Sequence, residues 1–259
     1  MRTMKKRHLG QHFLIDRSVM NRIVEAASLT SEDLVVEIGP GPGELTRMLS
    51  KNVRKVIAIE LDERLYGRLK GQLDGYGNVE LVLGDALDYP YETLPEFTVV
   101  ANIPYYITTP LLFRLIASKE NLRSLTLTVQ KEVAERIVAS PGGKDYGVLS
   151  LMVQYHAVPD LLFFVSRKAF RPQPEVDSAV IRIQIRQEPA VVVKDEKMFF
   201  RIIKTAFSQR RKMLSNSLAS IRSDPKEWLK EAGIDPARRP ETLSIQEFAR
   251  LSDRARGIA

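Results

Sequence analysis

The sequence contains no cysteine and only three histidines among its 259 residues. Disulfide bonds and thiolate metal ligands are therefore excluded. His8 and His12 lie near the start of the chain and His156 stands alone, so the histidines do not suggest a metal centre. We predict that the protein binds no metal.

Long hydrophobic runs are also absent. No stretch approaches the ~18 consecutive apolar residues from which a membrane-spanning helix is read. The basic start, Met1–His8, is not followed by the apolar segment of a secretory signal. We expect a cytoplasmic protein with no membrane association, and a monomer, because no exposed apolar stripe stands out.

The charge is unevenly distributed along the chain. The formal net charge is +7, and residues 187–259 hold 15 Lys and Arg against 10 Asp and Glu, whereas residues 1–186 hold 24 against 22. A basic surface attracts polyanions, chiefly through phosphate contacts and counterion release. Charge alone leaves nucleic-acid binding and ordinary solubility about equally open.

Short β-branched apolar runs alternate with helical patterns through the first two thirds of the chain. This alternation predicts a doubly wound, mostly parallel sheet with strands buried on both faces. The predicted strands are Leu34–Ile38, Val56–Ile59, Val79–Leu83, Phe97–Ala101 and Leu125–Val129, with an antiparallel pair from Leu161–Val165 and Ala179–Ile185. The predicted helices are Val19–Ala27, Gly43–Ser50, Glu63–Leu73, Pro110–Ser118 and Lys131–Ala139.

The pattern changes at Gln187-Glu188-Pro189, beyond which only helices are predicted. We expect one domain over residues 1–186 and a small, basic, all-helical domain over residues 187–259. Ser244 and Glu247 have the spacing of a capping box. The predicted helices are Asp195–Phe207, Lys212–Ile221, Lys226–Ala232 and Ser244–Leu251.

A glycine-rich turn, Gly39–Gly43, follows the first predicted strand of the sheet and opens a helix. Glycines at such a turn let the backbone approach a ligand closely. The spacing is G-x-G-x-G rather than the G-x-G-x-x-G of dinucleotide sites, Glu37 precedes the turn, and Pro40 and Pro42 stiffen it. These details count against an NAD site.

Acidic residues follow the next two predicted strands. Glu60 can accept two hydrogen bonds from a ribose diol, and Asp85 can accept the amine of an adenine. One acid for the ribose and one for the base fit S-adenosylmethionine better than NAD.

The fourth predicted strand ends at Asn102-Ile103-Pro104-Tyr105. The amine of adenine is a poor nucleophile because its lone pair is delocalised into the ring. The Asn102 side-chain oxygen and a nearby carbonyl, that of Ile103, can accept its two hydrogens and expose that lone pair. Attack on a sulfonium methyl then depends mainly on positioning, and Tyr105 would stack on the base. Four such residues alone would indicate only a turn.

Taken together, the motifs resemble those of the KsgA-type ribosomal RNA adenine dimethyltransferases, which have relatives among the Erm resistance methyltransferases. The resemblance spans nearly the whole chain. It is carried by Leu9–Leu14, Val36–Gly41, Ile59–Asp62, Gly84–Ala86, Asn102–Tyr105, Phe170–Ser178 and Ala206–Leu214. It implies a Rossmann-like class I S-adenosylmethionine methyltransferase fold, with an α/β sheet and a C-terminal helical domain.

The resemblance also implies roles for individual residues. The cofactor site would comprise His12, Leu14, Gly39, Gly41, Glu60, Leu61, Asp85, Ala86 and Asn102. Many relatives carry Asn where this chain has His12, so a backbone contact is the firmer expectation there. The target base would meet Asn102, Pro104, Tyr105 and the ring of Phe170, and folded RNA would meet Arg210, Arg211 and Lys212.

The implied activity is methyl transfer to N6 of two adjacent adenosines in the 3′-terminal hairpin of 16S rRNA, in an immature 30S subunit. An Erm-like enzyme acting on 23S rRNA, and a ribosome assembly factor with secondary methylation, are the alternatives. The helical domain with the motif Phe207–Arg211 and the motif Phe170–Pro174 favour the first. A DNA adenine methyltransferase fits less well, because no target-recognition domain is visible.

Overall fold

The computed structural model describes residues 11–209 and 211–255. They divide into two compact units, which we call the sheet unit and the helical unit. The sheet unit comprises Met1–Ala134 and Pro159–Ile185, and the helical unit comprises Glu135–Val158 and Arg186–Ala259. The predicted domains, residues 1–186 and 187–259, stay a prediction. In the structure the segment Glu135–Val158 groups with the later residues.

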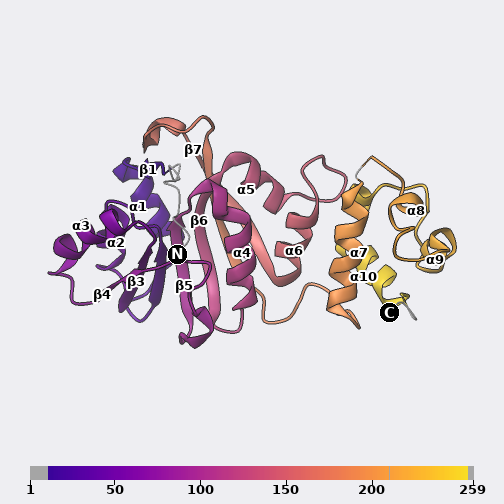
Figure 1. Cartoon of the computed structure of the whole chain (residues 1–259), viewed down its shortest axis with the longest axis horizontal. Helices are drawn as coiled ribbons and strands as arrows, with labels where there is room; N and C mark the ends of the chain where they lie inside the picture. The colour runs from indigo at the N-terminus through magenta and orange to yellow at the C-terminus, as the bar shows by residue number, and fades with distance from the viewer. Residues whose placement is uncertain (1–10, 210, 256–259) are drawn as a thin grey trace, which may run out of the picture. The chain divides into compact units, whose positions relative to one another are not determined.

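The sheet unit is built on a seven-stranded sheet with the order β4-β3-β2-β5-β6-β9-β7 (Figure 1). Strands β4, β3, β2, β5 and β6 pair in parallel, and β9 runs antiparallel to β6. The predicted sheet and its strands are therefore confirmed. The bounds are β2 Leu34–Ile38, β3 Lys55–Glu60, β4 Val79–Leu83, β5 Phe97–Asn102, β6 Leu122–Gln130, β7 Ala157–Val165 and β9 Ser178–Ile185.

Helices connect the parallel strands, and acidic residues cap the first turns of two of the helices in this unit. Asp16 accepts hydrogen bonds from the N–H groups of Ser18 and Val19 at the start of α1, and Asp62 caps α3 in the same way. The bounds are α1 Arg17–Ala26, α2 Glu44–Leu49, α3 Glu63–Leu73, α4 Thr108–Ala117 and α5 Lys131–Val138, with short 3-10 helices at η1 Tyr91–Thr93, η2 Tyr105–Ile107 and η3 Arg167–Ala169.

A small second sheet pairs β1 (Phe13–Leu14) with β8 (Phe170–Arg171) in antiparallel fashion. It joins the start of the described chain to a segment about 160 residues later, and Ile15 N–H also donates to the Ala169 carbonyl. Two-residue strands carry no periodic signal, so the sequence analysis did not predict this pairing.

Phe170 is fully buried in the sheet unit, in a hydrophobic core that includes Leu14, Met20 and Ile23. The pairing of β8 with β1 directs its ring inward while the neighbouring Arg171 is exposed. The expectation that the ring faces a target base stays a prediction, and in this structure it would require the ring to leave the core. Tyr105 is the other predicted stacking residue.

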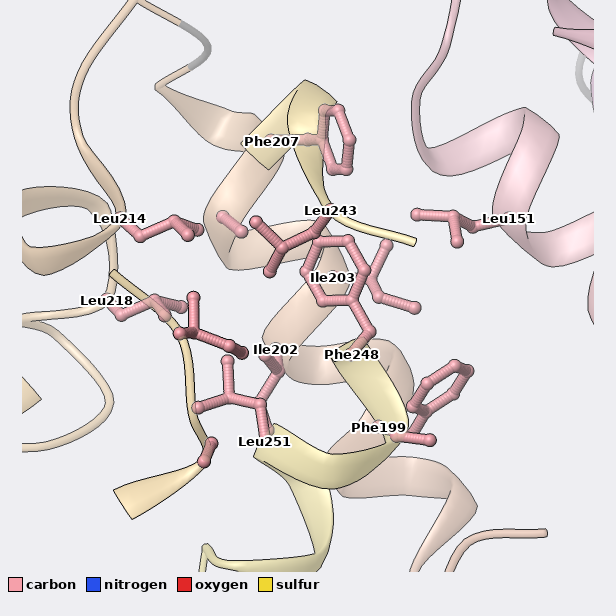
Figure 2. Close-up of a cluster of buried hydrophobic side chains, with 14 of the residues drawn as sticks. Leu151, Phe199, Ile202, Ile203, Phe207, Leu214, Leu218, Leu243, Phe248 and Leu251 are labelled. Carbon is pink, nitrogen blue, oxygen red and sulfur yellow. The ribbon is translucent and has the colours of Figure 1, made fainter. Parts of the chain in front are cut away.

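The helical unit has a hydrophobic core formed between α7 (Glu196–Ser208) and α10 (Ile245–Asp253), where Ile203 and Phe248 point toward each other (Figure 2). The only tryptophan, Trp228, is fully buried there and donates a hydrogen bond to the Leu251 carbonyl. The other helices are α6 Val148–His156, α8 Leu214–Ser217, α9 Pro225–Glu231 and η4 Pro240–Thr242.

The predicted helices of this unit are present, and the capping box of Ser244 and Glu247 is confirmed. The helix predicted over Lys212–Ile221 is shorter, because α8 covers only Leu214–Ser217. Ser and Asn side chains there compete with the helical backbone for hydrogen bonds. The sequence analysis did not predict α6, which is apolar over most of its surface and so lacks a helical stripe. No helix in the two described ranges is both long and apolar enough to cross a membrane.

Replacing Phe170 by Ala should lower the free energy of unfolding by about 3–5 kcal/mol, because it removes a fully buried ring from the core. Urea denaturation monitored by circular dichroism measures this loss. The matched substitution Phe164→Ala removes a ring that is 53% exposed and lies beneath the Lys131 ammonium, and should cost about 1 kcal/mol or less. Equal losses for the two variants would contradict the core position of Phe170.

Candidate active site

The carboxyl ends of β4, β3, β2 and β5 meet at one edge of the sheet, where ligands bind in open α/β folds. A cavity of about 380 Å³, counting its open mouth, lies at this edge. Its lining brings together many of the residues predicted for the site: His12, Gly39, Gly41, Glu60, Asn102, Pro104 and Tyr105, with Gln11, Phe13 and Ile103. The structure thus assembles residues spread over some 90 positions of the chain.

The glycine-rich turn forms one wall of the cavity. Gly39 and Gly41 have positive φ angles of 68° and 56°, which residues with a side chain rarely adopt. A Cβ atom at Gly41 would lie 2.7 Å from Cδ1 of Phe13. Gly41 therefore leaves no room for a side chain of its own, and the backbone of Gly39 and Gly41 is presented directly to the cavity.

Glu60 is buried at the end of β3 and holds the glycine-rich turn in place. One carboxylate oxygen accepts from the Gly41 N–H at 3.3 Å, and the other accepts from the Asp62 N–H at 2.8 Å. Burial raises the pKa of Glu60, although these backbone hydrogen bonds oppose the rise. Each oxygen keeps a further lone pair, so the carboxylate can still accept hydrogen bonds from a diol.

Two of the residues predicted to hold the adenine, Asp85 and Ala86, follow the end of β4. Asp85 accepts a hydrogen bond from the Leu87 N–H at 2.9 Å, and the Gly84 N–H donates to the Glu60 carbonyl. Ala86 is buried and Leu61 is exposed. These residues lie beside Glu60 on the adjacent strand end, but Leu61, Asp85 and Ala86 are not among the lining of the cavity described above.

Asn102 is oriented by the segment that begins the described chain. Its side-chain N–H donates to the His12 carbonyl at 3.0 Å, so its oxygen is left free to accept. The His12 Nδ1–H donates to the Pro172 carbonyl at 2.7 Å, and the ring lines the cavity. The backbone contact to the cofactor expected of His12 stays a prediction; in this structure the His12 carbonyl contacts Asn102.

Tyr105 lies on the other side of the cavity mouth. Its hydroxyl hydrogen-bonds with the Ser178 hydroxyl at 2.6 Å, and its ring centre lies 5.6 Å from that of His12. Burial raises the pKa of Tyr105, which keeps the phenol neutral at physiological pH. A half-buried ring fixed at its far end suits stacking on a flat base.

In the sequence, Glu37 indicates only that the glycine-rich turn differs from a dinucleotide site. It is buried near the end of β2, and its Oε2 has no hydrogen-bond partner. It lines a second cavity beside the first, together with Phe13, Leu14 and Asn102. A carboxyl group in an otherwise apolar strand, Leu34–Ile38, was the signal in the sequence.

Two of the three residues predicted to contact RNA are exposed in the helical unit. Arg211 and Lys212 follow α7, where the Lys212 N–H closes a turn onto the Gln209 carbonyl at 2.8 Å. Arg210 lies outside the described residues. Within residues 11–209 and 211–255, no group of three or more His, Cys, Asp or Glu side chains could hold a metal ion.

Sequence comparison finds close relatives of the chain. A model of the ribosomal RNA adenine dimethylase family matches residues 2–256. The ribosomal RNA small subunit methyltransferase A of Pelotomaculum thermopropionicum is 47% identical over 266 residues, which cover 96% of this chain and 90% of the relative. The protein of the same name from Bacillus cereus is 46% identical over 263 residues, with the same coverage of both chains.

Solved structures with the same fold also cover nearly the whole chain. A dimethyladenosine transferase from Plasmodium falciparum superimposes with a TM-score of 0.79 and 28% identity, over 93% of this chain and 96% of that one. The 23S rRNA methyltransferase ErmE superimposes with a TM-score of 0.73 and 30% identity, over 93% of this chain and 98% of that one. Both cover residues of the sheet unit and of the helical unit.

The pH dependence of stability should depend on Glu37. Burial raises its pKa from 4.5 to about 8; the nearby Thr46 hydroxyl lowers it, Glu60 raises it and Arg47 lowers it. The folded protein therefore holds a proton that the unfolded chain loses near pH 4.5, and the associated stability is lost as the pH rises toward about 8. Glu37→Gln should become more stable relative to the unsubstituted protein between about pH 5 and about pH 8, as measured by urea denaturation.

Glu25→Gln provides the control for this comparison, because Glu25 is an exposed carboxylate on α1 that lines neither cavity. Its profile of stability against pH should follow that of the unsubstituted protein. Parallel profiles for Glu37→Gln and the unsubstituted protein would contradict the raised pKa.

Proposed function

The chain belongs to the ribosomal RNA adenine dimethylase family, and from this we propose that it methylates N6 of two adjacent adenosines in the 3′-terminal hairpin of 16S rRNA, within the immature small ribosomal subunit. It is an S-adenosylmethionine-dependent rRNA adenine dimethyltransferase. The cofactor supplies a methyl group bonded to a sulfonium, and this chain supplies the site that orients the adenine amine toward it.

The hydrogen bond from Asn102 to the His12 carbonyl is the observation that carries the proposed role of the site. Because the Asn102 N–H is occupied, its oxygen is presented as an acceptor at the cavity. The Ile103 residue also lines the cavity, and its carbonyl is the proposed second acceptor. Two acceptors can bind both hydrogens of an adenine amine and draw its nitrogen toward a tetrahedral geometry.

No strong base is needed for this step, since the amine loses a proton only after it has gained the methyl group and become cationic. Proximity and orientation then supply much of the rate enhancement. Tyr105 would hold the plane of the base, and Pro104 would fix the backbone between the two acceptor groups and the ring. This arrangement relies on positioning rather than on a titrating catalytic group.

The proposed cofactor contacts follow the strand ends. Gly39 and Gly41 would lie against the cofactor, since a Cβ atom at Gly41 would clash with Phe13 where the turn faces the cavity. Glu60 would bind the ribose hydroxyls, and Leu61, Asp85 and Ala86 would form the adenine side. His12 and Leu14, from the segment that borders both cavities, would cover the methionine end.

The choice of small-subunit rRNA rests on the relatives. Those named ribosomal RNA small subunit methyltransferase A are 46–47% identical to this chain, whereas the 23S rRNA methyltransferase ErmE is 30% identical. Small-subunit rRNA is therefore the proposed substrate, and 23S rRNA is the alternative that the experiment must exclude.

The protein should transfer label from radioactive S-adenosylmethionine to unmethylated 30S particles, and not to 23S rRNA. Digestion of the labelled RNA should release N6,N6-dimethyladenosine. In the same assay, Asn102→Ala should lower the rate by about 100-fold, because the acceptor that orients the amine is lost. Asn102→Asp should be similarly impaired, since a carboxylate cannot donate to the His12 carbonyl.

Asn52→Ala makes the same change at an exposed position and should keep the unsubstituted rate. Label on 23S rRNA in place of 30S particles would overturn the proposed substrate. An unchanged rate for Asn102→Ala would overturn the proposed role of Asn102 while leaving the substrate intact.

Arg211 and Lys212 are proposed to contact the phosphates of the rRNA. The double substitution Arg211→Glu and Lys212→Glu should raise KM for 30S particles at least tenfold and reduce its salt dependence, because phosphate contacts release counterions. The affinity for S-adenosylmethionine, measured by calorimetry, should not change. Lys226→Glu and Lys230→Glu, two exposed positions on α9, form the matched charge control. Equal effects of both pairs would indicate general repulsion rather than a local contact.

A further inference from the structure

Glu37 lies in the wall of the second cavity with a carboxyl oxygen that no donor satisfies. It is 2% exposed, and it lies two residues before Gly39 at the end of a strand whose other residues are apolar. A buried polar atom without a partner costs free energy, so its retention calls for a reason. The residues around Glu37 do not supply such a reason, because none of them neutralises its charge.

The neighbouring charged groups do not neutralise Glu37. Arg47, the cation whose charge acts on Glu37, donates its hydrogen bonds to Glu44 and to the Pro42 carbonyl. The Thr46 hydroxyl, on the same turn of α2, lowers the pKa of Glu37 as a nearby donor but carries no positive charge. On the side of β3, the adjacent ionisable group is the carboxyl of Glu60, which repels a second negative charge.

The remaining walls offer Asn102 from β5, which is neutral, and the segment of residues 11–14, which includes His12. The His12 ring is occupied by the Pro172 carbonyl. Among the described residues that line the second cavity there is therefore no cation to pair with the Glu37 carboxyl.

We propose that Glu37 is the counter-group for the positive charge at the methionine end of S-adenosylmethionine, and that it becomes ionised when the cofactor binds. The inference rests on the proposed function, because it takes S-adenosylmethionine as the cofactor. The cation is either the sulfonium, which only the methyl donor carries, or the ammonium, which the demethylated product also carries.

A proton should leave the protein when the cation binds. The buried carboxyl of Glu37 has a pKa of about 8 in the free protein, so near neutral pH it is mostly protonated. A cation nearby favours the ionised form and lowers that pKa. Affinity for the cofactor should therefore rise with pH below about 8, by roughly tenfold per pH unit at most.

The test is calorimetric titration of the full chain with S-adenosylmethionine, S-adenosylhomocysteine and 5′-methylthioadenosine. The last compound has the adenosine and a thioether but no positive charge. Titrations near pH 6 and pH 7 avoid deprotonation of the ligand's own α-amino group, which ionises near 8. Repeating them in two buffers of different ionisation enthalpy gives the number of protons released.

The unsubstituted protein should release most of a proton on binding S-adenosylmethionine near pH 7. Glu37→Gln should bind it at least tenfold more weakly and release no proton, while its affinity for 5′-methylthioadenosine should stay unchanged. A loss for S-adenosylhomocysteine as well would assign the cation as the ammonium, and a loss for S-adenosylmethionine alone would assign it as the sulfonium. Either result supports the proposal.

Glu25→Gln, a change of an exposed carboxylate on α1 that lines neither cavity, is the matched control and should behave like the unsubstituted protein with all three ligands. Equal weakening of all three ligands by Glu37→Gln, or no weakening, would overturn the proposal. Proton release that persists in Glu37→Gln would also overturn it, since the proton would then come from another group such as Glu60. The proton count in the unsubstituted protein requires no variant, so a value of zero overturns the proposal even if Glu37→Gln does not fold.

Failure of the proposed function has a separate outcome in this experiment. If the unsubstituted protein binds neither S-adenosylmethionine nor its product, the cofactor assignment itself is wrong. If it binds them without proton release and Glu37→Gln binds them equally well, only the role of Glu37 is lost.

Discussion

The parallel register of β4, β3, β2 and β5 is the constraint on which the site depends. It pairs Ile38 with Ile59 and Glu60 with Leu83, so the chain leaves each strand at nearly the same level of the sheet. Every following turn is therefore directed to one edge, where glycine backbone, carboxylates and the Asn102 amide meet. A shift of one residue in any of these strands would turn its terminal side chain to the opposite face.

The two buried carboxyl groups at that edge, those of Glu60 and Glu37, differ in how far the protein stabilises a negative charge on them. Glu60 is buried, but two backbone N–H groups satisfy its oxygens and tie the glycine-rich turn to β3. Glu37, equally buried on the adjacent strand, has an oxygen with no partner and a pKa raised by desolvation. The two acids therefore differ in their hydrogen bonding. Backbone N–H groups satisfy the carboxylate of Glu60, whereas one oxygen of Glu37 has no hydrogen-bond partner.

The Asn102 amide is oriented by a segment far from it in the sequence. The β1–β8 pairing and the hydrogen bond from His12 to the Pro172 carbonyl hold residues 12–14 over the ends of the strands. From there the His12 carbonyl accepts from Asn102 and decides which end of that amide can serve as an acceptor. Phe170, the first residue of β8, is buried in the core and holds β8 in place for this pairing.

The sequence by itself determined the sheet, most helices and the residues of the strand tips, because β-branched runs, acidic caps and glycine turns are local signals. Gly39, Glu60 and Asn102 could be identified since each follows directly on a predicted strand, and Tyr105 completes the motif that Asn102 begins. Only the tertiary structure decided the orientation of the Asn102 amide, the inward position of Phe170 and the isolation of the Glu37 oxygen. These depend on contacts between segments up to about 160 residues apart, and no local pattern records which donors such segments bring to a buried group.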